Sequence, residues 1–244
     1  MPENSLPPGI KMPHRSLAVS PVSAEGKSTG QRVSEAWVLH QSGNLSQAET
    51  KYREILALDP SHAKTLHLFG LLVLQLGNAP QAIKMIRRSL EMAPEDAHTH
   101  LSLGDAYFAE DQLQLAMESY RQSRELDPTS EAAWVNLGNT HYGLGNFDEA
   151  ARAYLAALEI NPDAGDALNN LALSYEQVGK HAEALVYIDK TLDRHPNDPD
   201  TLYVKGVILE ELKRTSEAYD YYKKVVDIQP SHTEAAQKIE ERGY

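Results

Sequence analysis

The chain has 244 residues, of which 41% are hydrophobic and 24% are charged, a composition that suits one or two folded domains and excludes disorder throughout. Its formal net charge of −12 disfavours nucleic acid as the main partner, because phosphate binding needs a basic surface, so a neutral or basic partner fits better. The absence of cysteine excludes disulfides and thiolate metal sites, and no apolar run is long enough to predict a membrane span.

Residues 1–30 form a Pro/Ser-rich stretch without helical or alternating hydrophobic periodicity, and we expect a disordered N-terminal extension. Closely spaced prolines would break an amphipathic targeting helix, and the apolar core of a secretory signal is missing, so we expect a cytoplasmic protein. The stretch carries three basic residues, Lys11, Arg15 and Lys27, against two acidic ones, Glu3 and Glu25. An alternative to disorder is therefore that this basic segment lies in an acidic groove of its own chain.

A proline recurs every 34 residues over the rest of the chain, at Pro60, Pro94, Pro128, Pro162, Pro196 and Pro230. When this proline is numbered position 32 of each repeat, position 20 is always alanine and position 8 is always glycine or alanine. Such small residues mark the places where two helices approach closely. A larger side chain at either position should lower the free energy of unfolding by about 1–3 kcal/mol. The period predicts six repeats over residues 31–232, with bounds at 31–62, 63–96, 97–130, 131–164, 165–198 and 199–232.

Each repeat contains two amphipathic segments, at about positions 2–14 and 18–30, in which apolar residues recur with helical spacing. Between them, position 15 is glycine in four repeats, which suits a left-handed residue at the end of the first helix. Asp111 and Lys213 replace that glycine in repeats three and six. We expect the turns there to be strained or differently shaped.

The two ends of the repeat region depart from the pattern. Arg32 and Glu35 stand in repeat one where later repeats usually have apolar residues, which predicts a water-facing N-terminal cap. In the last segment, 233–244, Glu240 occupies the glycine position, so a second helix could not pack there. We expect a C-terminal capping helix, with no room after it in this sequence for a catalytic domain.

Repeat four, residues 131–164, contains the most complete set of the residues that define the pattern. Its characteristic residues are Trp134, Leu137, Gly138, Gly145, Ala150, Tyr154, Ala157 and Pro162. This spacing resembles the tetratricopeptide repeat (TPR), a helix-turn-helix module of the same length. The resemblance implies an all-α fold, a right-handed α-solenoid of six repeats plus a capping helix. It also implies that the first helix of each pair lines a concave groove, in which members of the family hold an extended peptide.

On this reading, the groove wall consists of positions 2, 5, 6, 9, 12 and 13 of each repeat. In repeats one and two these positions are largely apolar, whereas in repeats three to six they are polar, acidic and partly aromatic. We expect aromatic residues to supply apolar contact and acidic residues to favour Lys or Arg in the peptide. The predicted peptide-binding residues are Asp105, Phe108, Asn136, Asn139, Tyr142, Asn169, Asn170, Glu176 and Tyr203.

Asn136 and Asn170 occupy position 6 of adjacent repeats, where an amide can both donate to and accept from a peptide backbone. The pair resembles the asparagine ladder in the repeat region of O-linked N-acetylglucosamine transferases. If the ladder binds peptide, changing both asparagines to alanine should weaken peptide binding by about 1–3 kcal/mol per lost buried pair and leave the thermal transition nearly unchanged. The alternative is that asparagine is only tolerated on a wet helix face. A clamp for an acidic chaperone tail is disfavoured, because Asp166 and Asp200 stand where it needs cations.

The sequence contains only incomplete matches to motifs for catalysis, cofactor binding or metal binding. Residues 26–29, Gly-Lys-Ser-Thr, match the tail of a phosphate-binding loop, but the upstream glycine is Pro21 and no strand precedes it. His98 and His100 are two residues apart and so point to different faces of a helix, which does not suit metal ligands. We therefore predict no enzyme activity, no catalytic residue, no cofactor and no metal.

The leading hypothesis is a non-enzymatic scaffold or adaptor that binds an extended segment of a partner protein in its groove. One alternative is a self-assembling scaffold or coat, in which exposed apolar residues of repeats one and two bind a second copy and form a homo-oligomer. Residues 174–185 also resemble the corresponding repeat of magnetosome-associated scaffold proteins. A further alternative is an accessory subunit of an enzyme such as a glycosyltransferase.

Overall fold

The computed structural model describes residues 26–242, in which the chain forms thirteen α-helices and no strand. The helices are α1 (Thr29–Gln41), α2 (Leu45–Leu58), α3 (Ala63–Gln75), α4 (Ala79–Met92), α5 (Ala97–Ala109), α6 (Leu113–Leu126), α7 (Glu131–Gly143), α8 (Phe147–Ile160), α9 (Gly165–Gln177), α10 (His181–Arg194), α11 (Pro199–Glu211), α12 (Thr215–Ile228) and α13 (Thr233–Arg242). Six helix pairs and one final helix confirm the predicted all-α solenoid. None of these helices is both long and apolar enough to cross a membrane.

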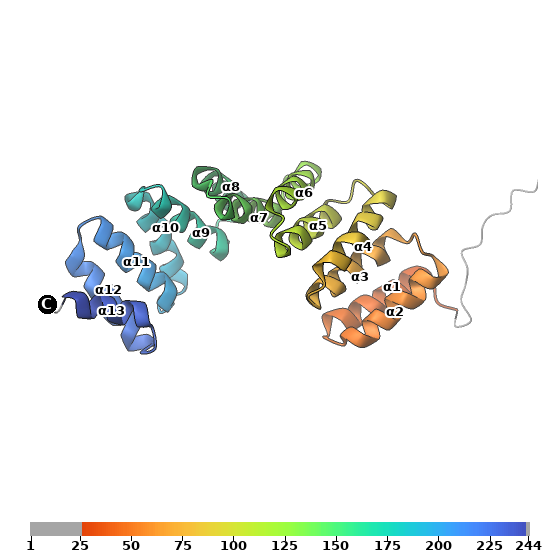
Figure 1. The fold of residues 1–244 in the computed structure, drawn as a ribbon, viewed down its shortest axis with the longest axis horizontal. Coiled ribbons are helices and arrows are strands. Elements are labelled where there is room, and N and C mark those ends of the chain that lie inside the picture. The colour runs from red at the N-terminus through yellow and green to blue at the C-terminus, as the bar shows by residue number, and fades with distance from the viewer. Residues whose placement is uncertain (1–25, 243–244) are drawn as a thin grey trace, which may run out of the picture.

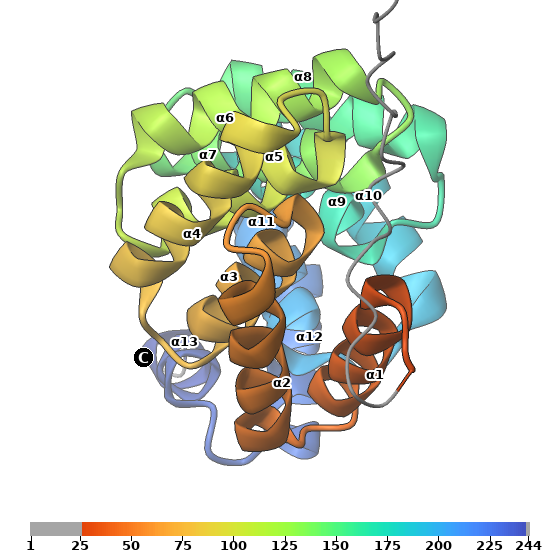
Figure 2. The same ribbon diagram turned by 90° about the vertical axis from the view of Figure 1, so that its right-hand side faces the viewer.

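The helix pairs follow one another along an arch (Figure 1). In its middle, α5, α7 and α9 lie on the inner edge, and α6, α8 and α10 lie on the outer edge. Contacts join consecutive helices and also the first helices of neighbouring repeats, such as α5 with α7 and α7 with α9. Turned by 90°, the pairs wind around the long axis of the molecule and do not stack in one plane (Figure 2).

Close packing of the two helices within a repeat explains the small residues of the sequence pattern. All six alanines at position 20 are completely buried. In repeat four, the large residue at position 24 closely approaches the glycine at position 8, because a Cβ on Gly138 would lie 2.4 Å from the Tyr154 ring. A Cβ on Gly70 would likewise lie 2.6 Å from Ile86. The small residue and its large partner therefore form one packing unit.

The turns between paired helices share one backbone conformation. Gly43, Gly77, Gly145 and Gly179 have φ angles between 73° and 80°. Asp111 and Lys213 adopt the same left-handed region, with φ of 55° and 62°. Of the two expected outcomes for repeats three and six, a strained turn or a differently shaped one, the structure shows the strained turn. Both turns keep their shape, and a residue with a Cβ bears the strain of the left-handed conformation.

The first helix begins at Thr29, two residues before the predicted boundary of the repeat region. Ser28 forms a capping box with Gln31, in which the Gln31 N–H donates to Ser28 Oγ at 3.3 Å and the Ser28 N–H donates to Gln31 Oε1 at 2.8 Å. Residues 26–29, which match part of a phosphate-binding loop, thus form a helix start. The rest of the predicted extension, and the prediction that it occupies the groove, lie outside the described residues.

The ends of the solenoid carry polar residues where inner repeats are apolar. Glu35 is exposed and forms an ion pair with Lys27 at 2.9 Å. At the other end, α13 packs Ala235 and Ile239 against the last helix pair and leaves Glu240 exposed. Glu35 and Glu240 thus face water, and the capping of the two ends stays a prediction.

Candidate functional site

In repeat three, three side chains from three helices meet at one oxygen atom. The Tyr120 hydroxyl of α6 donates to Asp105 Oδ1 of α5 at 2.9 Å. Asn136 Nδ2 of α7 donates to the same oxygen at 2.8 Å. We call Asp105, Tyr120 and Asn136 the repeat-three rung, because it connects the two helices of one repeat to the first helix of the next.

Repeat four contains the same arrangement with a neutral acceptor. The Tyr154 hydroxyl of α8 donates to Asn139 Oδ1 of α7 at 2.8 Å, and Asn170 Nδ2 of α9 donates to that oxygen at 3.0 Å. We call Asn139, Tyr154 and Asn170 the repeat-four rung. It matches the repeat-three rung position by position, except that asparagine replaces aspartate as the acceptor.

The terminal repeats give the tyrosine hydroxyl a different acceptor. In repeat six, Tyr222 donates to Glu210 Oε2 at 2.9 Å, and Lys238 of α13 donates to the same atom at 2.7 Å. In repeat one, the Tyr52 hydroxyl lies 3.5 Å from His40 Nδ1. In both, the acceptor comes from position 12 instead of position 9.

The remaining two repeats have no hydroxyl at position 24 and no polar residue at position 9. Repeat two pairs Ile86 with Leu71, and repeat five pairs Ile188 with Leu173. A polar side chain on the inner helix therefore accompanies a buried tyrosine of the outer helix, since a buried hydroxyl needs a hydrogen-bond partner. Sequence reasoning missed Tyr120, Tyr154 and Lys238, although this pairing was visible as a signal.

The rungs change the interpretation of the two asparagines. Asn136 and Asn170 are half-buried and bind the preceding repeat, so their loss should reduce stability, contrary to the expectation of an unchanged thermal transition. Each Nδ2 retains a second N–H after donating to its rung. Asn136 Oδ1 accepts no hydrogen bond from any residue in 26–242. The amides therefore connect repeats and still have hydrogen-bonding capacity for a ligand.

Asp105 is the most unusual member of the two rungs. Burial raises the pKa of its carboxyl, and the hydrogen bond from Tyr120 only partly offsets that effect. Burial, together with the Asp105 charge, raises the pKa of the Tyr120 hydroxyl, which stays protonated and keeps donating. Asp105 forms no ion pair with any Lys, Arg or His in the described part of the chain. It is a desolvated acid held by two neutral donors.

A small pocket of about 170 Å³ opens beside the repeat-three rung. Its lining residues are Asp105, Phe108, Ala109, Tyr120, Asn136 and Asn139. Four of the predicted peptide-binding residues are thus brought together around one cavity. Phe108 is 41% exposed there, so an aromatic ring next to a partly buried acid remains open to solvent.

Two further predicted residues lie farther along the inner helices. Tyr142 packs edge-on against Phe147, with ring centroids 5.1 Å apart. Burial raises the pKa of Tyr142, and the negative charge of Glu176 adds to the effect. Tyr142 and Glu176 extend the polar wall from α7 to α9.

Asn169 and Tyr203 differ from the other predicted residues. Asn169 Oδ1 is buried and has no hydrogen-bond partner among residues 26–242. The ring of Tyr203 lies 5.7 Å from that of Tyr222 and 4.8 Å from that of His232, so it packs toward the C-terminal end of the solenoid. The structure does not bring either of them to the pocket beside the repeat-three rung.

The inner wall of repeats one and two is largely closed by packing. Leu68 and Leu71 join the core cluster of these repeats, and Leu74 packs against the next cluster. His67 lies 2.8 Å from Ser102 Oγ, and burial lowers the pKa of its imidazole. The apolar half of the predicted groove therefore belongs mainly to the interior of the solenoid.

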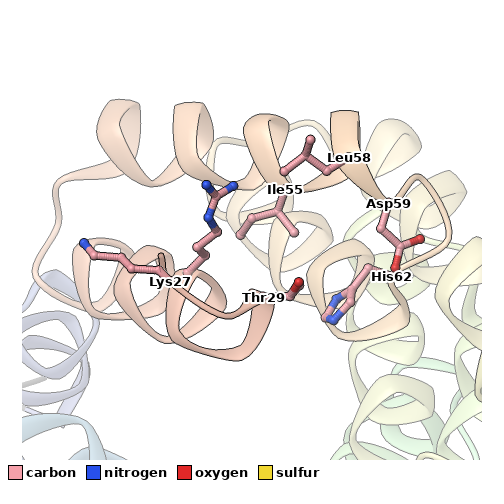
Figure 3. A pocket seen from close by; sticks show the side chains of 7 residues that line it. Lys27, Thr29, Ile55, Leu58, Asp59 and His62 are labelled. Carbon is pink, nitrogen blue, oxygen red and sulfur yellow. The ribbon is translucent and has the colours of Figure 1, made fainter. Parts of the chain in front are cut away.

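A second pocket, which the sequence did not predict, lies at the N-terminal end (Figure 3). It encloses about 420 Å³ and is lined by Lys27, Thr29, Arg32, Ile55, Leu58, Asp59 and His62. In repeat four, Trp134 occupies the position of Arg32 and lies under the Arg124 guanidinium of the preceding repeat, 5.1 Å from the ring centroid. No described helix precedes α1 to cover its pocket in this way.

Metal binding finds no support in the side-chain arrangement. Within residues 26–242, no three His, Asp or Glu side chains come together in a way that could hold a metal ion. His100 Nε2 donates to the Pro94 carbonyl at 2.8 Å, while His98 is exposed.

Family models agree with the repeat geometry. Models described as tetratricopeptide repeat match residues 39–104, 135–199 and 172–233, and one described as TPR repeat matches residues 104–145. Together they span residues 39–233, well over half of the chain. The chain belongs to the tetratricopeptide repeat family. No curated protein matches it in sequence.

Solved TPR structures are similar over most of this chain. PilF of Pseudomonas aeruginosa has 16% sequence identity, a TM-score of 0.75, and coverage of 88% of this chain and 96% of its own. YrrB, described as a TPR protein with an unusual peptide-binding site, has 19% identity, a TM-score of 0.68, and coverage of 76% and 96%. MamA has 25% identity, a TM-score of 0.62, and coverage of 66% and 94%. The first two likenesses show the fold alone.

Proposed function

We propose that this TPR protein is a non-enzymatic scaffold that holds an extended segment of a partner protein along α5, α7 and α9. The observation that carries the proposal is the pocket beside the repeat-three rung, where Phe108 stays exposed next to hydrogen-bonding groups of two neighbouring repeats. Exposed aromatic rings surrounded by polar groups are typical of binding hot spots. The peptide-binding TPR protein YrrB, which has a similar fold, supports this choice of partner class.

Polar groups on the inner helices suit a peptide backbone. The second N–H of Asn136 and of Asn170 can donate to backbone carbonyls, and Asn136 Oδ1 can accept from a backbone N–H. Tyr142 and Glu176 continue the same surface. Such contacts do not depend on the peptide side chains, so the wall fits an extended segment better than a folded domain. With a net charge of −12 on the chain, a neutral to basic segment is favoured.

The test is a selection of linear peptides from a displayed random library against the whole chain, followed by titration of the recovered peptides. Phe108→Ala should weaken binding by about tenfold or more, as expected for an aromatic hot spot. Leu126→Ala is a matched control, because Leu126 is 40% exposed on the outer helix α6 and Phe108 is 41% exposed on α5. Recovery of no peptides, or equal affinity of both variants, would overturn the proposal.

Self-association is a second candidate function, favoured by one observation. Among the described residues, the four most exposed large hydrophobic side chains all lie in repeats one and two, namely Val38, Leu58, Leu76 and Met92, at 53–65% exposure. Light scattering over a concentration series should then show a rise in mass that the double variant Val38→Ser and Leu76→Ser abolishes. A constant monomer mass at high concentration would exclude this candidate.

We also infer that the protein acts in the cytoplasm and without catalytic activity of its own. The TPR family supplies scaffolds that are typically non-catalytic, which supports the second inference. An accessory role beside an enzyme such as a glycosyltransferase remains a prediction. Purification of the native complex would test it through a co-purified activity.

A further inference from the structure

The carboxylate of Asp105 has one oxygen engaged and one available. Oδ1 accepts from both Tyr120 and Asn136, which fills its two lone-pair directions. Oδ2 accepts no hydrogen bond from any residue in 26–242, and the side chain lines the pocket. The half of the carboxylate that the repeat-three rung does not use is therefore available to a ligand.

The negative charge of Asp105 is not needed for the rung itself. In repeat four, the neutral Asn139 accepts from Tyr154 and Asn170 with nearly the same distances. Burial makes the charged form of Asp105 less favourable, as its raised pKa indicates. A neutral asparagine would serve the fold at least as well. The negative charge of Asp105 therefore lowers the stability of the folded chain, and a bound cation would offset this destabilisation.

The surroundings of the pocket favour a cation with an apolar stem. Phe108 and Ala109 are the last two residues of α5, and the carbonyl end of a helix attracts positive charge. The Phe108 ring offers a surface for a methylene chain or for the cation itself. At about 170 Å³, the cavity is smaller than the roughly 300–1,000 Å³ of small-molecule sites, so it suits a single side chain.

We propose that this pocket is a subsite for one lysine side chain of the bound segment, with the ammonium held by Asp105 Oδ2 and Asn136 Oδ1 and the stem against Phe108. Lysine fits better than arginine, because an arginine fork needs two free carboxylate oxygens and Oδ1 is already occupied. The subsite rests on the proposed function, since the lysine belongs to the segment held along α5 and α7. The subsite makes the inner wall selective for lysine at one position of the segment, whereas the rest of the wall contacts the peptide backbone.

The test uses three synthetic nonapeptide pools with acetylated and amidated ends. Each pool has a fixed central residue, which is lysine, arginine or norleucine, and flanking positions drawn equally from Ala, Ser, Thr, Leu and Val. Affinities are measured for the full chain and for Asp105→Asn. Glu211→Gln is the matched control, because it removes one negative charge from an exposed site on α11 away from the pocket.

The full chain should bind the lysine pool at least about tenfold more tightly than the norleucine pool, with arginine between them. Asp105→Asn should reduce that ratio to below about threefold without weakening norleucine binding, while Glu211→Gln keeps the ratio of the full chain. An unchanged ratio in Asp105→Asn, or arginine preferred over lysine, would overturn the lysine subsite. If all pools bind equally and Phe108→Ala weakens them, only the subsite fails. If no pool binds, the proposed function fails with it.

Discussion

The repeat-three and repeat-four rungs have nearly the same hydrogen-bond arrangement and differ in the charge of one residue. Both use a tyrosine of the outer helix, an acceptor at position 9 and an asparagine from the next repeat. Only the acceptor differs, Asp105 in one rung and Asn139 in the other. Since the neutral rung shows that hydrogen bonding alone can connect the repeats, the comparison separates what the fold requires from what repeat three adds. The added feature is a desolvated negative charge facing a pocket.

Removing the tyrosine hydroxyls should give the largest difference between the rungs. Tyr120→Phe removes a hydrogen bond to a charged acceptor and should lower the free energy of unfolding by about 1.5–3 kcal/mol. Tyr154→Phe removes one to a neutral amide and should cost only about 0.5–1.5 kcal/mol. Chemical denaturation at pH 7 measures both. Equal losses would mean that the charge of Asp105 does not strengthen its rung.

Packing at position 8 should respond equally in the two repeats. An alanine Cβ at Gly104 or Gly138 would lie 2.4 Å from the ring of Tyr120 or Tyr154. Each substitution should therefore cost about 1–3 kcal/mol, because the ring must shift in a filled interior. Thermal unfolding of the two variants would show whether the difference between the rungs is confined to their polar atoms. Gly165→Ala is the control, because a Cβ there would meet no atom within 4 Å. A loss at Gly104 more than twice that at Gly138 would contradict this.

The asparagines test the connection between neighbouring repeats. Asn170→Ala should cost about 0.5–1.5 kcal/mol, and Asn136→Ala should cost more, because its acceptor is charged. Hydrogen exchange should locate the loosening at the contact between consecutive repeats, since solenoid stability depends on neighbouring interfaces. Protection that is unchanged at α7 and α9 in both variants would show that the amides do not hold the repeats together.

The sequence predicted the architecture well, because its causes are local and repeated. The proline period, the alanine at position 20 and the glycine turns each depend on residues within one repeat. The rungs were not predicted, because they depend on atoms from neighbouring repeats whose relative placement follows from superhelical packing. A usable signal was nevertheless present. Tyrosine at position 24 accompanies Asp105 or Asn139 at position 9 in repeats three and four, and His40 or Glu210 at position 12 in repeats one and six, whereas isoleucine accompanies leucine at position 9.

For the candidate site too, the sequence did not show which residues of neighbouring elements come into contact. Phe108 and Asn136 were assigned to the inner wall through the resemblance to the TPR family, and the structure places both beside one pocket. Tyr203 was assigned by the same rule, but its ring packs on His232 from the loop before α13. The open pocket beside Arg32 was not predicted either, since it depends on what covers the first repeat. Periodicity identifies a helix face and does not say what packs against it.

The most direct test of the central claim is the free energy of unfolding of Asp105→Asn between pH 4 and pH 7. Because burial raises the pKa of Asp105 above its ordinary value of 3.8, ionisation destabilises the folded chain above the folded-state pKa. We predict that Asp105→Asn is at least as stable as the wild type at pH 7, and that its advantage shrinks as the pH falls and Asp105 takes up a proton. A loss of more than about 1 kcal/mol at pH 7 would show that the fold itself requires the charge.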